Sequence, residues 1–555
     1  MLTEQPSWLS KRRIVAGPTF NRWLVPPAAL AVHLCIGMAY GFSVFWKPLQ
    51  AALVGADGQP LAACAAGAVT FADKWSGTVQ ALTATQCNWT QFDLGWMYTL
   101  FFVVLGLAAA LFGPWLERVG PRVAGLTATI CWCGGLLIGA AGVHAHALWL
   151  MWLGSGLIGG VGLGLGYISP VSTLMKWFPD RRGMAAGLAI AGFGGGAMIG
   201  SPLATLLMSH YASPGDPGVA ATFVALALIY AVFMTGGSLT YRLPPKDWEP
   251  AGYVPTEDEG DRVAHRHVHV REAHQTPQFW LLWLVLCLNV SAGIGIIGAA
   301  SPMLQETFAG HLIGHPDLAF GALKQHPDFV KAAAAVAAGF VGLLSLFNIA
   351  GRFIWASASD HFGRRPTYLV FFALGAAMYL LAAHAAEAKS LSLFVGCFCV
   401  IASMYGGGFA TIPAFLADLF GSHFVGAIHG RLLTAWSTAG VVGPVIVNYL
   451  HDVRAESGSV AADMIYGSIF SVLAGLLACG LLAALAIRPV ATKHFMSESE
   501  LAAAQEADHI AHAQAHPADA DHGSVWAVVL SWTAVGLPLL YGVGVTVQKA
   551  IVLFH

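Results

Sequence analysis

The sequence predicts an all-α polytopic membrane protein made of two six-helix halves and a thirteenth helix at the C-terminal end. Three observations predict this fold class: the 555 residues are 57% hydrophobic and only 10% charged, thirteen long apolar runs follow one another, and one pattern of glycines and charges occurs twice. Apolar runs of about twenty residues match the hydrocarbon core of a bilayer. Each run should be a helix, because lipid offers no hydrogen-bond partner to an open strand edge.

The apolar runs are separated by polar connections, with boundaries uncertain by about two to four residues. The thirteen expected spans are 24–46, 92–116, 123–143, 147–174, 183–209, 220–241, 279–303, 332–358, 367–384, 391–417, 429–450, 464–487 and 525–553. They divide the chain into a cytoplasmic N-terminus (1–23), an N-terminal six-helix bundle (24–241), a central cytoplasmic loop (242–278), a C-terminal six-helix bundle (279–487), a cytoplasmic linker (488–524) and an extra transmembrane helix (525–555). The polar N-terminus has no cleavable signal peptide pattern, so the first run is expected to be a retained helix.

Basic residues set the expected orientation. With the N-terminus in the cytoplasm, eighteen of the 27 Lys and Arg residues fall in cytoplasmic segments and seven in outside segments, as the positive-inside rule requires. The C-terminus is then outside, and we expect the inner membrane of a bacterium. A net charge of −2 gives no reason to expect a nucleic-acid partner. Two cations, Arg352 and Arg431, fall within predicted spans and are not explained by topology.

The nine cysteines divide by location. Seven lie in apolar spans and are expected to be small packing residues. Cys64 and Cys87 share the first outside loop, and a disulfide between them is expected if that loop faces a periplasm.

An internal repeat links the two halves. The segment "GPWLERVGPR" at 113–122 resembles "ASASDHFGRR" at 356–365, with an offset of 243 residues. The same offset relates pairs far apart in the chain: Glu117 and Asp360, Arg122 and Arg365, Pro170 and Pro413, Gly187 and Gly430, Gly200 and Gly443. Two parallel halves related in this way are the architecture of the major facilitator fold.

The repeated loop carries an acid at a helix C-terminus followed by basic residues. Such a loop can latch the two halves in one gating state, because the acid can pair with nearby cations. The alternative is a topology anchor without a gating role. The expected gating residues are Glu117, Arg118, Arg122, Asp360, Arg364 and Arg365.

Arg352 lies eight residues before Asp360, which marks the cytoplasmic end of its helix. At about 1.5 Å per residue it lies roughly 12 Å deep, near the middle of a hydrocarbon core about 30 Å thick. A charge there costs at least about 2.5 kcal/mol. A buried ion pair would offset that cost, but the nearest candidate acids all fall near helix ends: Asp93, Glu117, Glu306, Asp360 and Asp418. A second alternative is satisfaction by carbonyls and amides such as Asn348. We favour a third, in which the guanidinium binds an anionic substrate.

Several aromatic residues fall near the same depth. Tyr167, Tyr405 and Trp436 belong to that layer, and Tyr40 lies nearer the outside. They are expected to wall a substrate site, because aromatic rings exclude water and so strengthen the field of the arginine. Packing without ligand contact is the alternative for each.

His33 is alone in the first apolar span. A histidine titrates near neutral pH, so proton coupling would pass through it; a hydrogen-bonded core histidine is the alternative.

Glycine-rich stretches fall inside or beside apolar helices. "GLGLGYISP" and "GFGGGAMIGSP" lack the strand that precedes a nucleotide-binding loop. They are expected to allow close helix packing and bending.

Four segments carry a family resemblance: "CIGMAYGFSVFWKPL", "GLGYISPVSTLMKWFPDRRGMAAGLAIAGFGGGA", "GRFIWASASDHFGRR" and "GRLLTAWSTAGVVGPV". They resemble the oxalate/formate antiporter family of major facilitator transporters, over about residues 20–490. The resemblance implies a twelve-helix carrier of small carboxylates with Arg352 at the substrate. The aromatic walls of that family correspond to Tyr40, Tyr167 and Tyr405. The final span resembles single-helix small subunits of such transporters, and a plain membrane anchor is the alternative.

One departure from the family pattern bears on the substrate. The eleventh helix, "TAWSTAGVVGPVIV", lacks the lysine expected in oxalate exchangers of the family. A single deep cation suits a monoanion, so formate, lactate, pyruvate or a similar monocarboxylate is favoured over oxalate.

The predicted function is secondary transport of small carboxylates by alternating access, by a functional monomer in the lipid bilayer. Proton-coupled monocarboxylate symport and a carboxylate receptor that does not transport are the alternatives. No enzyme activity, cofactor or metal site is expected, because no catalytic or metal-binding set of residues lies at membrane depth.

Overall fold

The computed structural model describes residues 9–17, 19–55, 61–64, 70–213, 215–245, 248–250, 267–323, 326–421, 424–457, 465–501, 503 and 525–554. Much of the central loop 242–278 and most of the linker 488–524 therefore lie outside the described residues. The described part of the chain is helical, with isolated β-bridges as its extended pairings.

Thirteen helical segments of the described chain are long and apolar enough to cross a membrane, and each corresponds to one predicted span. The N-terminal half contains α1 (Val25–Ile36), α4 (Gln91–Val119), α5 (Pro121–His144), α6 (Leu148–Met151) with η4 (Trp152–Ile158) and α7 (Gly159–Trp177), α8 (Arg182–Tyr211) and α9 (Val219–Thr240). The C-terminal half contains α12 (Pro277–Phe308), α14 (Pro327–Phe362), α15 (Arg364–Glu387), α16 (Leu391–Phe420), α17 (Val425–Leu432) with α18 (Thr434–Ser457), and α19 (Ile465–Ala486). The thirteenth is α21 (Val525–Ala550). The all-helical fold class is confirmed.

The first span differs from the continuous helix that its apolar run predicts. The α-helix ends at Ile36, and a 3₁₀ segment, η3 (Gly37–Phe45), continues toward the short α2 (Trp46–Gln50). A side chain at Gly37 would lie 3.0 Å from the Cα of Gly196 on α8. The change of helix type therefore falls where α8 packs closely against the span, which hydropathy alone does not reveal.

The internal repeat has the same geometry in both halves. Gly120 and Gly363 each have φ +88°, a conformation that favours glycine. Arg122 donates a hydrogen bond to the carbonyl of Tyr241 at 3.3 Å, and Arg365 donates one to the carbonyl of Ala484 at 3.1 Å. The two carbonyls are also 243 residues apart. The duplicated loop therefore fastens the last helix of each half in the same way.

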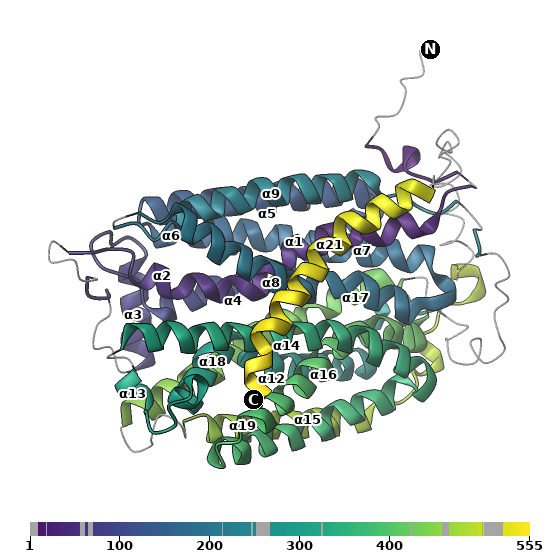
Figure 1. The fold of residues 1–555 in the computed structure, drawn as a ribbon. Coiled ribbons are helices and arrows are strands. Elements are labelled where there is room, and N and C mark those ends of the chain that lie inside the picture. The colour runs from purple at the N-terminus through teal and green to yellow at the C-terminus, as the bar shows by residue number, and fades with distance from the viewer. Residues whose placement is uncertain are drawn as a thin grey trace.

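The two halves lie side by side, as Figure 1 shows by the separation of purple-to-blue from green helices. They meet mainly where α4 packs on α17 and α18, and where α8 packs on α14 and α16. At the first of these contacts, the Ser437 hydroxyl donates to the carbonyls of Phe102 and Val103, each at 2.9 Å. A side chain at Gly430 would lie 3.0 Å from the carbonyl of Ala109. These contacts lie along the middle and the predicted cytoplasmic part of α4.

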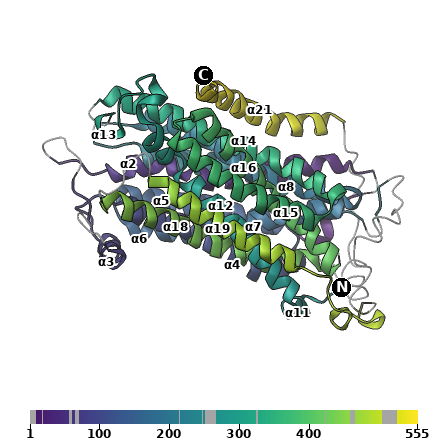
Figure 2. The same cartoon turned by 90° about the horizontal axis from the view of Figure 1, so that it is seen from below.

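The thirteenth helix, α21, rests on both halves. Trp532 donates a hydrogen bond to the carbonyl of Trp23 at 3.0 Å, just before α1. Farther along, Gly542 packs against Met198 of α8, and Thr546 packs against Gly342 of α14. Figures 1 and 2 show α21 crossing the outer surface of the bundle beside these helices. The extra helix therefore covers the seam between α8 and α14.

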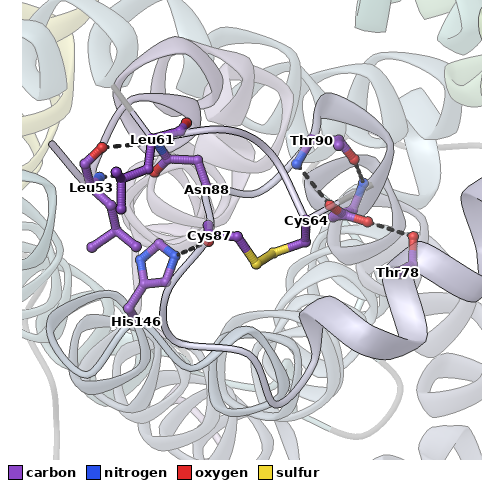
Figure 3. The surroundings of a disulfide bond; sticks show 9 residues. Leu53, Leu61, Cys64, Thr78, Cys87, Asn88, Thr90 and His146 are labelled. Carbon is purple, nitrogen blue, oxygen red and sulfur yellow. Dashed lines mark hydrogen bonds between the residues drawn. A yellow bond between two sulfur atoms is a disulfide. The ribbon is translucent and has the colours of Figure 1, made fainter. Parts of the chain in front are cut away.

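A disulfide joins Cys64 to Cys87 in the first outside loop (Figure 3). The His146 ring donates a hydrogen bond to the Cys87 carbonyl at 2.9 Å and stacks on Trp89 with ring centroids 4.2 Å apart. Burial lowers the pKa of His146, and its hydrogen bond to Cys87 opposes that shift. The Asn88 side chain donates to the carbonyls of Leu53 and Leu61, each at 2.9 Å. The bridge therefore closes a loop that is also held by side-chain hydrogen bonds.

Replacing Cys64 and Cys87 together by serine is expected to destabilise this loop by about 3 kcal/mol. The bridge closes a chain segment with a sequence separation of 23, and its loss frees the unfolded loop. Limited proteolysis and thermal unfolding in detergent would measure the change, with Cys479→Ser, an exposed free thiol, as the control. Equal protease resistance of the double variant and the control would contradict the prediction.

Candidate functional site

Arg352 lies on α14 with its side chain fully buried. Its Nε donates a hydrogen bond to the Asn348 side chain at 2.9 Å, and its Nη1 donates to the carbonyl of Ile190 on α8. The guanidinium carbon lies 5.7 Å from the ring centroid of Phe409 on α16. Its Nη2 is buried and has no hydrogen-bond partner among the described residues. Protein groups therefore hold Nε and Nη1, whereas Nη2 has no hydrogen-bond partner in the described chain.

This arrangement bears on the three alternatives for Arg352. No ion pair joins it to a carboxylate of the described chain, so a buried ion pair is not what holds it. Carbonyl and amide oxygens satisfy Nε and Nη1 but leave Nη2 without a partner. Buried polar groups are nearly always hydrogen-bonded, and a charged one without a partner is costly. Carbonyl and amide oxygens therefore account for two of the three guanidinium nitrogens, and substrate binding by Arg352 stays a prediction.

Glycines of α8 make room for the cation. A side chain at Gly194 would lie 3.1 Å from Arg352 Nε and 3.1 Å from Asn348 Oδ1. One at Gly187 would lie 2.8 Å from the backbone carbonyl of Arg352. The glycine-rich stretch therefore serves close helix packing, as its sequence context predicts.

An aromatic cluster surrounds Trp436 of α18. Its ring centroid lies 4.4 Å from that of Phe409, 5.2 Å from Tyr167 and 5.4 Å from Phe193. The ring centroid of Tyr40 lies 4.9 Å from that of Phe193. Tyr40 belongs to the 3₁₀ segment η3, so this segment also contacts the cluster. The rings come from both halves of the molecule.

Two hydroxyls close the outer side of this cluster. Tyr40 and Tyr405 share a hydrogen bond of 2.8 Å between their phenol oxygens, which joins the N-terminal half to the C-terminal half. Both tyrosines, and Tyr167, lie within electrostatic range of Arg352. The predicted residues Arg352, Tyr40, Tyr167, Tyr405 and Trp436 are thus brought to one place.

Two members of the site were not predicted from the sequence. Phe193 belongs to the glycine-rich stretch of α8, and Phe409 lies four residues after Tyr405, on the same face of α16. That spacing is a signal that could have found Phe409. Nothing in the sequence distinguishes Phe193 from the many other apolar residues of its helix.

Two further polar atoms of the cluster are buried without a partner in the described chain, the Tyr167 hydroxyl and the indole nitrogen of Trp436. Both are hydrogen-bond donors, and both belong to rings in contact with each other. Unsatisfied donors beside a half-satisfied guanidinium favour a small anion with more than one oxygen as the missing partner.

His33 lies beside Tyr167, with ring centroids 5.5 Å apart. Its Nε2 lies 3.2 Å from the carbonyl of Tyr167, and its Nδ1 contacts the carbonyl of Ala189. A neutral imidazole can donate to one of these carbonyls, whereas an imidazolium can donate to both. The ring is therefore hydrogen-bonded in the core, which is the alternative that the sequence left open for it.

A cavity of about 180 Å³ lies between the two halves on the predicted outside. One wall includes Tyr98 and Thr99 of α4, the other includes Gly295 of α12 and Asn448 of α18, and Tyr40 also lines it. The halves are in contact farther along α4, from Phe102 to Ala109, toward the cytoplasmic end. The described structure is therefore open toward the predicted outside, with the hydrogen-bonded Tyr40 and Tyr405 near the base of the cavity.

Two predicted gating residues of the N-terminal half, Glu117 and Arg118, lie at the predicted cytoplasmic end of α4. Glu117 forms an ion pair with Lys176 at 2.7 Å and accepts a hydrogen bond from Ser172 at 2.9 Å. A side chain at Gly426, at the start of α17 in the other half, would lie 3.8 Å from Glu117 Oε1. Arg118 is exposed. Glu117 is therefore positioned between its own half and α17.

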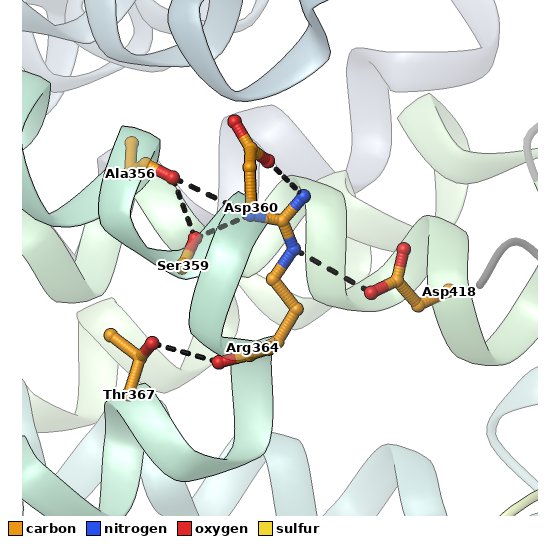
Figure 4. A network of polar contacts seen from close by, with 7 residues as sticks. Ala356, Ser359, Asp360, Arg364, Thr367 and Asp418 are labelled. Atoms are coloured by element: carbon orange, nitrogen blue, oxygen red, sulfur yellow. Dashed lines mark hydrogen bonds and ion pairs between the residues drawn. The ribbon is translucent and has the colours of Figure 1, made fainter. Parts of the chain in front are cut away.

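In the C-terminal half, Arg364 pairs with Asp360 and lies 3.5 Å from Asp418 on α16 (Figure 4). It also donates hydrogen bonds to Ser359 and, at 3.5 Å, to the carbonyl of Ala356. The partners named here for Arg364 all belong to the C-terminal half. Arg431 lies at the cytoplasmic end too, where it donates to the Val270 carbonyl at 2.7 Å, so it is not part of the aromatic cluster.

A sequence profile of the Major Facilitator Superfamily matches residues 62–323 and again residues 290–547. The uncharacterized MFS-type transporter YhjX of Escherichia coli is 24% identical, over 64% of this chain and 78% of that protein. The oxalate:formate antiporter of Oxalobacter formigenes is 26% identical, over 52% of this chain and 59% of that protein. Apicoplast pyruvate carrier 1 of Toxoplasma gondii is 26% identical, over 61% of this chain and 66% of that protein.

Among solved structures, the human organic anion transporter MFSD10 is similar with a TM-score of 0.55, over 84% of this chain and 100% of that chain. At 16% sequence identity this similarity shows a common fold. The family profile covers most of the sequence, and the duplicated halves of the structure agree with it. The chain belongs to the Major Facilitator Superfamily.

Proposed function

We propose that this protein is a secondary active transporter of small monocarboxylates such as formate, lactate or pyruvate. The observation that carries the proposal is the buried guanidinium of Arg352, which has one nitrogen without a partner in the described chain and lies against an aromatic cluster drawn from both halves. The carboxylate of a substrate would pair with that nitrogen. Relatives named as an oxalate:formate antiporter, a pyruvate carrier and monocarboxylate transporters support this substrate class.

A monoanion fits better than oxalate. The eleventh helix, formed by α17 and α18, contains no lysine, so it adds no ammonium beside the guanidinium. Two carboxylates in one low-dielectric site would leave one charge without compensation. The aromatic rings would instead contact the apolar part of a monocarboxylate.

Transport would proceed by alternating access. In the outward-facing state an anion reaches the cavity, and separation of Tyr40 from Tyr405 would admit it to Arg352. Rocking of the two halves about α4–α18 and α8–α14 would then close the outside and open the cytoplasmic end. Glu117, Arg118, Arg122, Asp360, Arg364 and Arg365 would stabilise the outward-facing state at the cytoplasmic end.

Proton-coupled symport is the second candidate, and His33 is the observation that favours it. Its two ring nitrogens face two main-chain carbonyls within the substrate layer, where a proton would be held. A carboxylate receptor is less well supported, because the named relatives are transporters rather than receptors or enzymes. We place the monomeric carrier in the bacterial inner membrane with its N-terminus in the cytoplasm and its C-terminus outside.

Counterflow in proteoliposomes tests the proposal. Vesicles loaded with unlabelled formate, lactate, pyruvate or oxalate are diluted into labelled substrate, with and without a pH gradient. Labelled monocarboxylate should accumulate transiently, and oxalate should exchange more weakly. Exchange without a pH effect indicates antiport, and dependence on the gradient indicates proton symport. Absence of flux with all four anions would overturn the transporter assignment in favour of a receptor.

A further inference from the structure

The outer cavity carries charges that the substrate site does not use. Lys74, on α3 (Phe71–Ala81) of the N-terminal half, lines it, as do Glu306 of α12 and His451 of α18 in the C-terminal half. Glu306 and His451 are hydrogen-bonded at 2.8 Å, with side-chain exposures of 15% and 23%. The ring of Tyr466 from α19 lies 5.4 Å from that of His451. The carboxylate and the imidazole therefore form a fixed, partly shielded pair in the wall of the cavity.

The charge of this pair changes in the range in which histidine titrates. When His451 is neutral, the wall presents the full negative charge of Glu306 to an approaching anion. When His451 is protonated, the imidazolium compensates the carboxylate, and the net charge of the cavity rises by one. Because a cleft with low-dielectric walls concentrates the field, one charge changes the local concentration of an anion considerably.

Other titratable or charged groups lie near the pair. On the described elements packed around it these are Lys74 of α3, Tyr449 and Arg454 of α18, Tyr466 of α19, Lys389 at the carbonyl of Thr307, and His311 of η6 (Ala309–Ile313). His311 is not among the residues that line the cavity. Among the described residues that line the cavity, His451 is the histidine, the residue type whose charge can change near neutral pH.

We propose that Glu306 and His451 form a pH-sensitive control site that sets how strongly the outer cavity attracts a carboxylate anion. External acid strengthens the attraction and neutral pH weakens it, without a proton entering the transport cycle. The inference rests on the proposed transport of monocarboxylates. The pair acts on the approach of the substrate, because it lies in the outer cavity and not in the aromatic cluster around Arg352.

The test measures KM and maximal rate for formate counterflow in proteoliposomes at equal internal and external pH, between about pH 5 and pH 8. Formate stays ionised over that range. The wild-type KM should fall by between about twofold and tenfold on acidification, with little change in the maximal rate. His451→Gln should keep the high KM at every pH, because Glu306 stays uncompensated. Glu306→Gln should have a low KM already near pH 8, because the repelling charge is absent, and acid should lower it further, because His451 can still gain a proton.

The control is His311→Gln, a histidine outside the cavity, which should retain the wild-type dependence on pH. Opposite effects of the two cavity variants exclude a general loss of folding as the cause. If His451→Gln keeps the wild-type fall in KM, or if acid changes only the maximal rate, the control site is refuted while transport stands. If the wild type shows no flux, the proposed function itself fails.

Discussion

Replacing Arg352 by glutamine should abolish monocarboxylate transport and leave the protein at least as stable as the wild type. The guanidinium is fully buried, and its Nη2 lacks a partner in the described chain, so this uncompensated charge lowers stability. Glutamine removes the uncompensated charge but also the partner of the substrate carboxylate. Loss of the ion pair between the guanidinium and the substrate carboxylate should weaken substrate binding by about 3 kcal/mol or more. This free energy corresponds to a decrease in uptake of roughly 100-fold.

Two measurements on the same preparation check this prediction: initial uptake of labelled formate in proteoliposomes, and thermal unfolding in detergent without substrate. The matched control is Arg431→Gln, which removes a guanidinium at the cytoplasmic end that is bonded to the Val270 carbonyl. Its uptake should stay close to that of the wild type. A large fall in the melting temperature of Arg352→Gln would mean that the guanidinium holds the bundle together. Wild-type uptake by that variant would refute the assignment of the site.

The sequence predicts the helices well because their cause is local. Each span needs an apolar run of sufficient length, and the positions of such runs are visible in any window of twenty residues. The repeat at an offset of 243 also predicts the parallel halves, and the matched hydrogen bonds of Arg122 and Arg365 are consistent with that offset. The break at Gly37 is different, because it depends on a neighbour, α8, that is far away in sequence.

The candidate site shows the same division between features with a local cause and features that depend on distant parts of the chain. Arg352 is conspicuous because a charge at membrane depth needs a reason, whichever helix surrounds it. Phe193 and Phe409 are inconspicuous, since an aromatic residue in an apolar helix is ordinary whether it faces lipid, core or ligand. Depth along a helix can be counted from its end, but the direction in which a side chain points depends on packing. The bond between Tyr40 and Tyr405 therefore required the structure.

The position of Arg352 depends on the close packing of α14 against α16, which small residues allow. A side chain at Gly351 would lie 2.6 Å from the Cα and 2.6 Å from the carbonyl carbon of Ser403. One at Gly406 would lie 2.7 Å from Asn348 Oδ1, the atom that accepts the hydrogen bond from Arg352. Contacts this short with backbone atoms cannot be relieved by a rotamer change. The two helices would have to separate.

Gly351→Val should therefore destabilise the protein by about 3 kcal/mol, the upper end of the usual cost of an overpacked core. Transport should fall in proportion to the fraction of protein that no longer folds. The matched control is Gly134→Val in α5, where a side chain would meet nothing within 4 Å. Thermal unfolding in detergent and the yield of monodisperse protein measure the difference. Because Arg352 follows Gly351 directly, separation of α14 from α16 would also displace the guanidinium from Asn348, so residual folded protein should have a raised KM. Equal melting temperatures of the two variants would show that α14 and α16 are not packed as closely as this geometry requires, and the placement of the cation would then lose its structural basis.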